Sequence, residues 1–426
     1  MKRILLSMAM LAIISGAAFA QKKAVKDAKT SLASKNYSEA RELIKPALKD
    51  PETMNDAETW KIAGDIENAA FDDERIKQMT GKKPEEKTMY EALWGTYNPY
   101  VKADSLGQLP DEKGKVKNKF RKDMAAIFKA NLPFFINGGV YYNDNKDYKH
   151  ACDFFEAYIN IPSLPMFDGA SLASLGVSDT LRQQIKYYAA ITAIQSGDKE
   201  RSITLLKNIV NNPFIPNQAS KESDAYELLT SQYLDKGDSV SYVQALQAGA
   251  KKFPESKYFT PNLINYLISK GKSAEALAYL DQAIVSDPSN SCQFISVKAS
   301  IYGEKNDFAN ADAAYKAALE KDPNCERALE GLAVSYIVQA QNLKEASSKT
   351  AVRKQQSAND PQIIKFYSDA VPLLEKYKSL LIARNAEKSE LKGCLVKLQN
   401  AYYNLSLLNI DKSKELKEIE TQLGGE

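Results

Sequence analysis

The sequence predicts an all-α fold made of repeated helix-turn-helix units. Its 426 residues include only 19 glycines and 16 prolines, together about 8% of the chain. A share of about 12% is usual, so the scarcity argues against a turn-rich β protein. Pro254, Pro288 and Pro323 lie 34 and 35 residues apart. A fixed period of this length is typical of helical repeats.

The second helix of each unit is predicted from an apolar stripe that ends at a proline. In the unit closed by Pro288 the stripe consists of Ala276, Leu280, Ala283 and Ile284. The spacing i, i+4, i+7, i+8 places these side chains on one helix face, and proline then stops the helix. The corresponding residues of the two neighbouring units are Tyr242, Leu246, Gly249 and Ala250, and Ala311, Tyr315, Ala318 and Leu319.

The first helix of each unit is predicted from helical apolar spacing that ends at a tight turn. Before one such turn lie Tyr226, Leu229 and Tyr233. The turns contain Gly237, Gly271 and Asn306, and glycine or asparagine there supplies the left-handed residue that ends a helix. The repeating unit is therefore helix, turn, helix, proline.

These residues resemble the tetratricopeptide repeat family over nearly the whole chain. The matching positions are Ile295, Ala299, Tyr302, Phe308, Ala311, Tyr315, Ala318 and Pro323, and in an earlier unit Phe135, Gly139, Tyr142, Tyr148, Ala151, Phe155 and Pro162. The resemblance implies a right-handed superhelical solenoid whose first helices line a concave groove. Small residues such as Gly64 and Gly139 are expected to let paired helices approach closely.

The repeat pattern suggests three regions after residue 20. Residues 21–130 carry degenerate repeats with an insertion at 95–114, and residues 131–325 form the central array, interrupted by an insertion at 163–180. Residues 326–426 are interpreted as long helices that cap the array, with a polar stretch at 341–360 and a charged end at 411–415. The alternative is a separate small helical domain.

Residues 1–20 have the pattern of a signal peptide. Lys2 and Arg3 precede an apolar run, and Ala18-Phe19-Ala20 is a cleavage site of the A-x-A kind. The run is shorter than the ~20 residues of a membrane span. We therefore expect cleavage near Ala20, export to the periplasm or the exterior, and no transmembrane span afterwards.

Composition and motifs offer little for catalysis. The formal net charge is +3, which gives no electrostatic footprint for nucleic acid. His150, the single histidine, is expected on an outward helix face, and no nucleophile, phosphate-loop or zinc-protease motif occurs. Residues 72–74 (Asp-Asp-Glu) are interpreted as a solvated helix face rather than a metal site. We expect no enzyme activity, cofactor or metal.

The four cysteines are Cys152, Cys292, Cys325 and Cys394, and none shows C-x-x-C spacing. Partly buried free thiols are the favoured interpretation. Disulfides stay open, because an exported protein can form them.

The groove positions implied by the family resemblance are mostly neutral and polar. They are Asn137, Asn143, Tyr187, Ser231, Asn265 and Ser300. The basic residues with which some family members hold an acidic peptide terminus are missing from this set. The leading hypothesis is a non-enzymatic envelope scaffold that binds another protein or peptide. The alternative is a glycan- or small-ligand-binding accessory of an uptake system, using aromatic residues such as Tyr97 and Tyr100.

Overall fold

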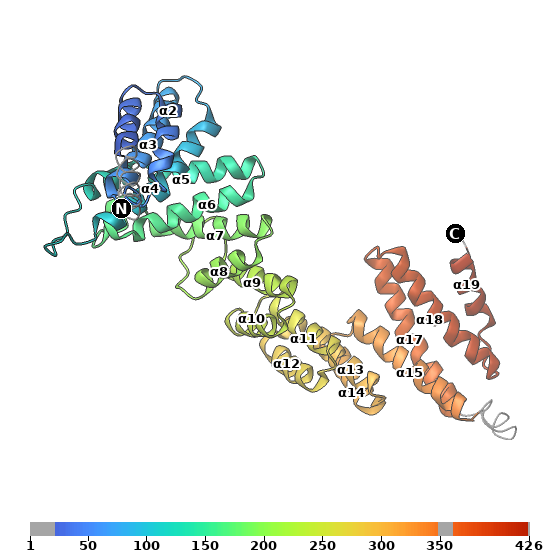
Figure 1. Ribbon diagram of the computed structural model, residues 1–426. Helices are drawn as coiled ribbons and strands as arrows, with labels where there is room; N and C mark the ends of the chain where they lie inside the picture. The colour runs from blue at the N-terminus through green and yellow to red at the C-terminus, as the bar shows by residue number, and fades with distance from the viewer. Residues whose placement is uncertain (1–21, 348–360, 425–426) are drawn as a thin grey trace, which may run out of the picture. The chain divides into compact units, whose positions relative to one another are not determined.

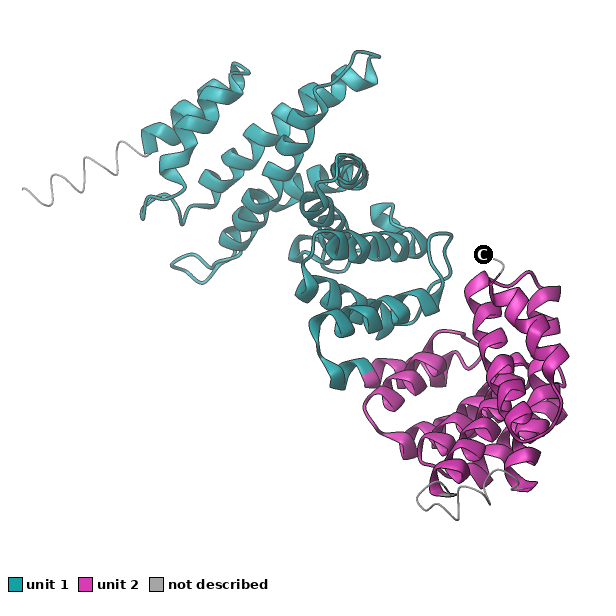
Figure 2. Ribbon diagram, turned by 90° about the vertical axis from the view of Figure 1, so that its right-hand side faces the viewer, with its two compact units in different colours: residues 1–242 teal, residues 243–426 magenta. Residues whose placement is uncertain are grey.

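The computed structural model describes residues 22–347 and 361–424. Every regular element in these residues is helical and none is a strand, which confirms the predicted all-α class (Figure 1). The chain divides into two compact units, residues 1–242 and residues 243–426 (Figure 2). The division falls within α10 (Ser239–Lys252). The sequence-based limits at residues 130 and 325 stay predictions.

Unit 1 is a series of helices that pack mainly against their neighbours in the chain. After a first helical segment at residues 22–33, its elements are α2 (Tyr37–Ala47), α3 (Ala57–Met79), α4 (Glu86–Gly107), α5 (Arg121–Asp144), α6 (Tyr148–Asn160), α7 (Asp179–Gln195), α8 (Lys199–Val210), α9 (Glu222–Lys236) and the beginning of α10. Aromatic side chains such as Phe71, Phe128, Phe135 and Phe154 fill its main core.

Unit 2 continues the hairpins and ends in longer helices. Its elements are the rest of α10, α11 (Phe259–Ser269), α12 (Ser273–Ser286), the 3₁₀ turn η4 (Pro288–Asn290), α13 (Ser291–Glu304), α14 (Phe308–Lys321), α15 (Glu326–Ser347), α17 (Pro361–Ala383), α18 (Lys388–Leu407) and α19 (Ser413–Gly424). One core cluster extends from Cys292 to Ile419. No helix in the described residues is both long and apolar enough to cross a membrane.

The turns inside the hairpins use the residues that the sequence indicated. Gly237, Gly271 and Asn306 adopt positive φ values of 77°, 69° and 61°. An aspartate follows some of these residues and caps the next helix: the Asp307 carboxylate accepts a hydrogen bond from the backbone N–H of Asn310. A left-handed residue followed by an N-cap reverses the chain in two residues, because one ends a helix and the other begins the next.

Close helix pairing depends on glycines that face aromatic rings. A Cβ atom on Gly64 would lie 2.5 Å from the Tyr100 ring, and one on Gly139 would lie 2.3 Å from the Phe155 ring. Gly331 stands in the same relation to Tyr315 in unit 2. The expected role of Gly64 and Gly139 is confirmed, since any side chain there would push two buried elements apart.

We expect Gly139→Ala to lower the free energy of unfolding by about 1–3 kcal/mol, because the Phe155 ring is 2% exposed and has no room to move away. Gly303→Ala is the matched control: Gly303 is also in a helix, and a methyl group added there would have no neighbour within 4 Å. That control should stabilise by about 0.5–1 kcal/mol through helix propensity. Denaturant unfolding followed by circular dichroism measures both, and equal effects would contradict the packing argument.

Part of the expected insertion at residues 95–114 is instead helical. Residues 95–107 of the expected insertion belong to α4, which continues through Pro99. The helix persists because Leu93, Tyr100 and Ala103 are fully buried. The charged end at 411–415 leads into another helix, α19, which buries Ile419.

The other two segments that were expected to interrupt the helices differ less from the prediction. Residues 163–180 do separate two helices, but the three 3₁₀ turns η1 (Ile161–Ser163), η2 (Pro165–Phe167) and η3 (Ala173–Leu175) give the segment defined structure. Of the polar stretch at 341–360, residues 341–347 belong to α15, and residues 348–360 lie outside the described residues.

The cysteine interpretation is wrong for one pair. Cys292 and Cys325 form a disulfide, with Cα atoms 6.3 Å apart. The two positions are 33 residues apart, which is close to one repeat, so adjacent hairpins bring them together. Cys152 and Cys394 are buried free thiols, as expected.

Candidate protein-binding groove

A groove of about 270 Å³ lies in unit 2 over α11, α12 and α13. α11 and α13 are the first helices of consecutive hairpins, and α15 begins the hairpin that follows. Gln293 of α13 and Arg327 of α15 are 34 residues apart and both line the groove. The repeat period thus places equivalent residues of successive first helices along one surface.

The floor of this groove is apolar. Ile264, Leu280 and Ala283 are at most 3% exposed. Phe294 and Val297 of α13 also line the groove and are partly buried. An occupant with apolar side chains would therefore remove further apolar surface from water.

Side-chain amides also line the groove. Asn265 and Gln293 line the groove with exposed side chains. Asn290 is held by Asp287, whose carboxylate accepts a hydrogen bond from the Asn290 side-chain amide at 2.6 Å. Hydrogen bonds from Ser289 and Asn290 keep the pKa of Asp287 below its usual value. Free amides both donate and accept, so they suit the backbone of an extended segment.

Two cations of the groove have no ion-pair partner in the part of the chain that the structure describes. They are Lys257 and Arg327, and both are exposed. The carboxylates nearest to Arg327 in sequence are already engaged. Glu326 pairs with Arg384 at 2.9 Å, and Glu330 pairs with Lys397 at 3.1 Å. Arg327 is thus available for an anionic group of an occupant.

A second hollow, of about 550 Å³, shares Gln293 and Arg327 with the groove and continues toward α15 and α17. Ser300 lines this hollow, and its Oγ lies 2.9 Å from the Tyr315 hydroxyl oxygen.

The structure brings only part of the predicted groove set together. Asn265 lines the groove and Ser300 lines the neighbouring hollow, both in unit 2. Asn137, Asn143, Tyr187 and Ser231 belong to unit 1. Burial raises the pKa of the Tyr187 hydroxyl. Sequence reasoning missed Lys257, Gln293 and Arg327, although the 34-residue spacing of the last two was a usable signal.

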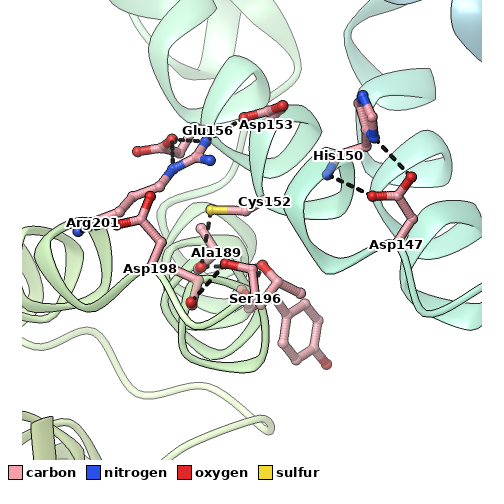
Figure 3. A network of polar contacts seen from close by, with 12 residues as sticks. Asp147, His150, Cys152, Asp153, Glu156, Ala189, Ser196, Asp198 and Arg201 are labelled. Atoms are coloured by element: carbon pink, nitrogen blue, oxygen red, sulfur yellow. Dashed lines mark hydrogen bonds and ion pairs between the residues drawn. The ribbon is translucent and has the colours of Figure 1, made fainter. Parts of the chain in front are cut away.

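His150 lies on an outward helix face, as expected. Its side chain is 48% exposed, and its Nδ1 is 2.8 Å from the Asp147 carboxylate that caps α6. Figure 3 shows this pair apart from the thiol of Cys152. Cys152 Sγ donates to the Ala189 carbonyl at 3.3 Å, and burial raises its pKa to about 12. The neutral thiol is a poor nucleophile.

Arg201 organises the charges beside Cys152. Its guanidinium donates to the carboxylates of Asp153 and Glu156, which links α8 to α6 (Figure 3). The cluster pairs opposite charges, and its three side chains are each between 22% and 27% exposed. Its role is therefore to join neighbouring helices.

The acidic run at residues 72–74 is only partly the solvated face that we expected. Asp72 pairs with Arg75, and Asp73 with Lys35. Glu74 is 9% exposed and accepts from Lys77 and from the backbone N–H of Glu85, so it ties α3 to the start of α4. In the described residues no group of three His, Cys, Asp or Glu side chains is placed to hold a metal ion.

The aromatic pair of the glycan alternative is mostly inaccessible. Tyr100 is 0% exposed and donates to Asp65 at 3.0 Å. Tyr97 is partly buried and stacks on Trp94, with ring centroids 5.8 Å apart. The proposed use of Tyr100 for glycan binding is wrong, because its ring is buried in the space above Gly64.

The fold and groove define a helical-hairpin repeat protein. A family model described as tetratricopeptide repeat matches residues 297–349, which run from α13 into α15 and beyond it. This match covers 53 of the 426 residues. A search of the curated proteins gives no match to it.

Several solved structures are similar to the chain at low identity. The C-terminal part of a repeat-containing protein from Cytophaga hutchinsonii is 15% identical, covers 67% of this chain and 98% of its own, and has a TM-score of 0.32. The TPR2AB domain of yeast Sti1 in complex with pHSP90 is 13% identical. Its alignment covers 64% of this chain and 98% of that domain, with a TM-score of 0.24. A human IFIT1 dimer with m7Gppp-AAAA is 15% identical. Its alignment covers 85% of this chain and 68% of the IFIT1 chain, with a TM-score of 0.32. The ligands belong to those proteins, and the absence of a nucleic-acid partner here stays a prediction.

Proposed function

We propose that this chain is a non-enzymatic scaffold of the cell envelope that holds an extended segment of a partner protein in the groove of unit 2. The groove itself carries the proposal: an apolar floor at Ile264 and Leu280 lies below free amides and two unpaired cations. A segment with apolar side chains and a carboxylate fits this combination. Its backbone would exchange hydrogen bonds with Asn265 and Gln293.

The export part of the proposal has two supports. Residues 1–20 have the composition of a cleaved leader. The Cys292–Cys325 disulfide belongs to a class of bond that persists in oxidising compartments and is rare in the cytosol. Fractionation of cells that express the full chain, with mass spectrometry of its N-terminus, tests the location and the cleavage near Ala20.

We expect a photo-crosslinking residue in place of Gln293 to capture one discrete partner in living cells. The same residue in place of Glu320, which is exposed on the second helix α14, should not capture it. Lys257→Glu with Arg327→Glu should reduce the product about tenfold, equivalent to about 1.4 kcal/mol. Lys305→Glu with Lys321→Glu changes the net charge equally at two exposed positions outside the groove and should leave the yield unchanged.

Equal products from positions 293 and 320 would contradict a groove-bound partner. The proposal would also be contradicted if Lys257→Glu with Arg327→Glu left the yield of crosslinked product unchanged while the control pair lowered it. If no protein is captured and an oligosaccharide raises the melting temperature, the glycan-binding alternative replaces the scaffold.

A further inference from the structure

Unit 1 contains a separate polar cleft of about 400 Å³ where the ends of three helices meet. Gln78 comes from the last turn of α3, and Glu86 and Tyr90 come from the start of α4. Asn137, Tyr141 and Asp144 come from the second half of α5. The groove of unit 2 shares none of these residues, so a role for this cleft does not depend on the proposed function.

The cleft carries uncompensated negative charge. Glu86 and Asp144 are exposed, and neither forms an ion pair within the described ranges. No lysine or arginine in the described chain lines the cleft. α3 ends at Met79 and α5 at Asp144, so the negative ends of two helix dipoles lie near the cleft, and the positive end of α4, which begins at Glu86, opposes them in part. A cation near helix C-termini is stabilised by the same field.

Tyr90 gives the cleft an aromatic wall and an unused hydroxyl. Its side chain is 5% exposed, yet its hydroxyl has no hydrogen-bond partner among the described residues. Burial, and then the charge of Glu86, raise its pKa to about 12. The ring of Tyr141 lies beside it, with centroids 5.1 Å apart and a 36° angle between the planes. The hydroxyl is not one of the buried unpaired polar atoms of the described residues, so it reaches the open cleft and is free to hydrogen-bond with a ligand there.

We propose that this cleft binds the guanidinium group of an arginine side chain that a partner protein presents. Two carboxylates suit the several N–H donors of a planar guanidinium, and the tyrosine rings suit its flat face. The amides of Gln78 and Asn137 accept its remaining hydrogens. A lysine ammonium is a strongly hydrated point charge and uses neither the ring face nor the spread of acceptors as well. Asn137, which the sequence pattern indicated, thus lies in a binding site of different chemistry from the unit 2 groove.

The test uses the full chain with ¹³C-labelled tyrosine, and NMR titration with a glycine-serine peptide that carries one central arginine. Tyr90→Phe and Tyr141→Phe assign the two signals. We expect saturable shifts at both rings, with binding at least about tenfold weaker when citrulline, the uncharged analogue, replaces arginine. A lysine peptide should also bind more weakly than the arginine peptide.

The matched variants separate the cleft from the overall charge. Glu86→Gln with Asp144→Asn should weaken arginine-peptide binding about tenfold. Glu112→Gln with Asp168→Asn makes the same charge change at two exposed positions of unit 1 and should have no effect. Circular dichroism and the melting temperature confirm that each variant is folded. Equal binding of arginine and citrulline peptides, equal loss in the control pair, or displacement by spermidine at the same concentration as by arginine would overturn the proposal.

Discussion

Arg121→Met should lower the free energy of unfolding by about 3 kcal/mol, because it leaves a buried carboxylate without its cation. Asp104 has a side chain that is only 4% exposed, and Arg121 donates to its two oxygens through Nε and Nη2 at 2.7 and 2.8 Å. Asn118 donates to the same carboxylate at 2.8 Å. This cluster fastens the end of α4 to the start of α5 across the turn at 108–120.

Tryptophan fluorescence during denaturant unfolding measures this loss where it occurs, since both tryptophans, Trp60 and Trp94, lie in α3 and α4. Asp104→Asn combined with Arg121→Met should cost clearly less than the two single changes added together, because no orphaned charge remains. Lys45→Met breaks an exposed ion pair with Glu42 and should cost under about 1 kcal/mol. An Arg121→Met effect as small as the Lys45→Met effect would show that water already screens Asp104.

The prolines of this chain include two groups, and only one of them could be predicted from the sequence. Pro254, Pro288 and Pro323 end second helices, and their common spacing made this predictable. Pro99, Pro133 and Pro372 lie inside helices. A proline inside a helix costs about 3 kcal/mol locally, and in α4 the burial of Leu93, Tyr100 and Ala103 offsets this cost. Such packing depends on partners distant in sequence, so the expected insertion at residue 95 could not be distinguished from a helix.

Dependence on residues distant in sequence also decides which residues of the candidate sites could be predicted. The repeat period predicted Asn265 as a groove residue, because its position on a first helix follows from the period alone. It did not find the available charge of Arg327, which depends on Arg384 and Lys397 engaging the neighbouring carboxylates. The arginine cleft needs the ends of α3, α4 and α5 together, and their long helices depart from the 34-residue pattern. Cys292 and Cys325 are the opposite case: their spacing of 33 in a repeat of about 34 was a usable signal for adjacent positions, and the interpretation as free thiols did not use it.

Loss of the Cys292–Cys325 disulfide should destabilise unit 2 by about 3–4 kcal/mol, because the bond closes a chain loop with a sequence separation of 33. Cys292→Ala with Cys325→Ala, compared with the oxidised chain by calorimetry, measures the loss. Hydrogen exchange should show it in α13, which contains Cys292, and in α14, which lies between the two cysteines.

Reductant is the control: it should lower the stability of the native chain and leave the double variant unchanged. Equal stability of the oxidised and reduced native chain would contradict the prediction. The bond also flanks the groove, since Cys292 precedes Gln293 and Cys325 lies two residues before Arg327. Reduction should therefore loosen the first turns of α13 and α15 together, and the crosslinked yield from position 293 should fall before unit 2 unfolds.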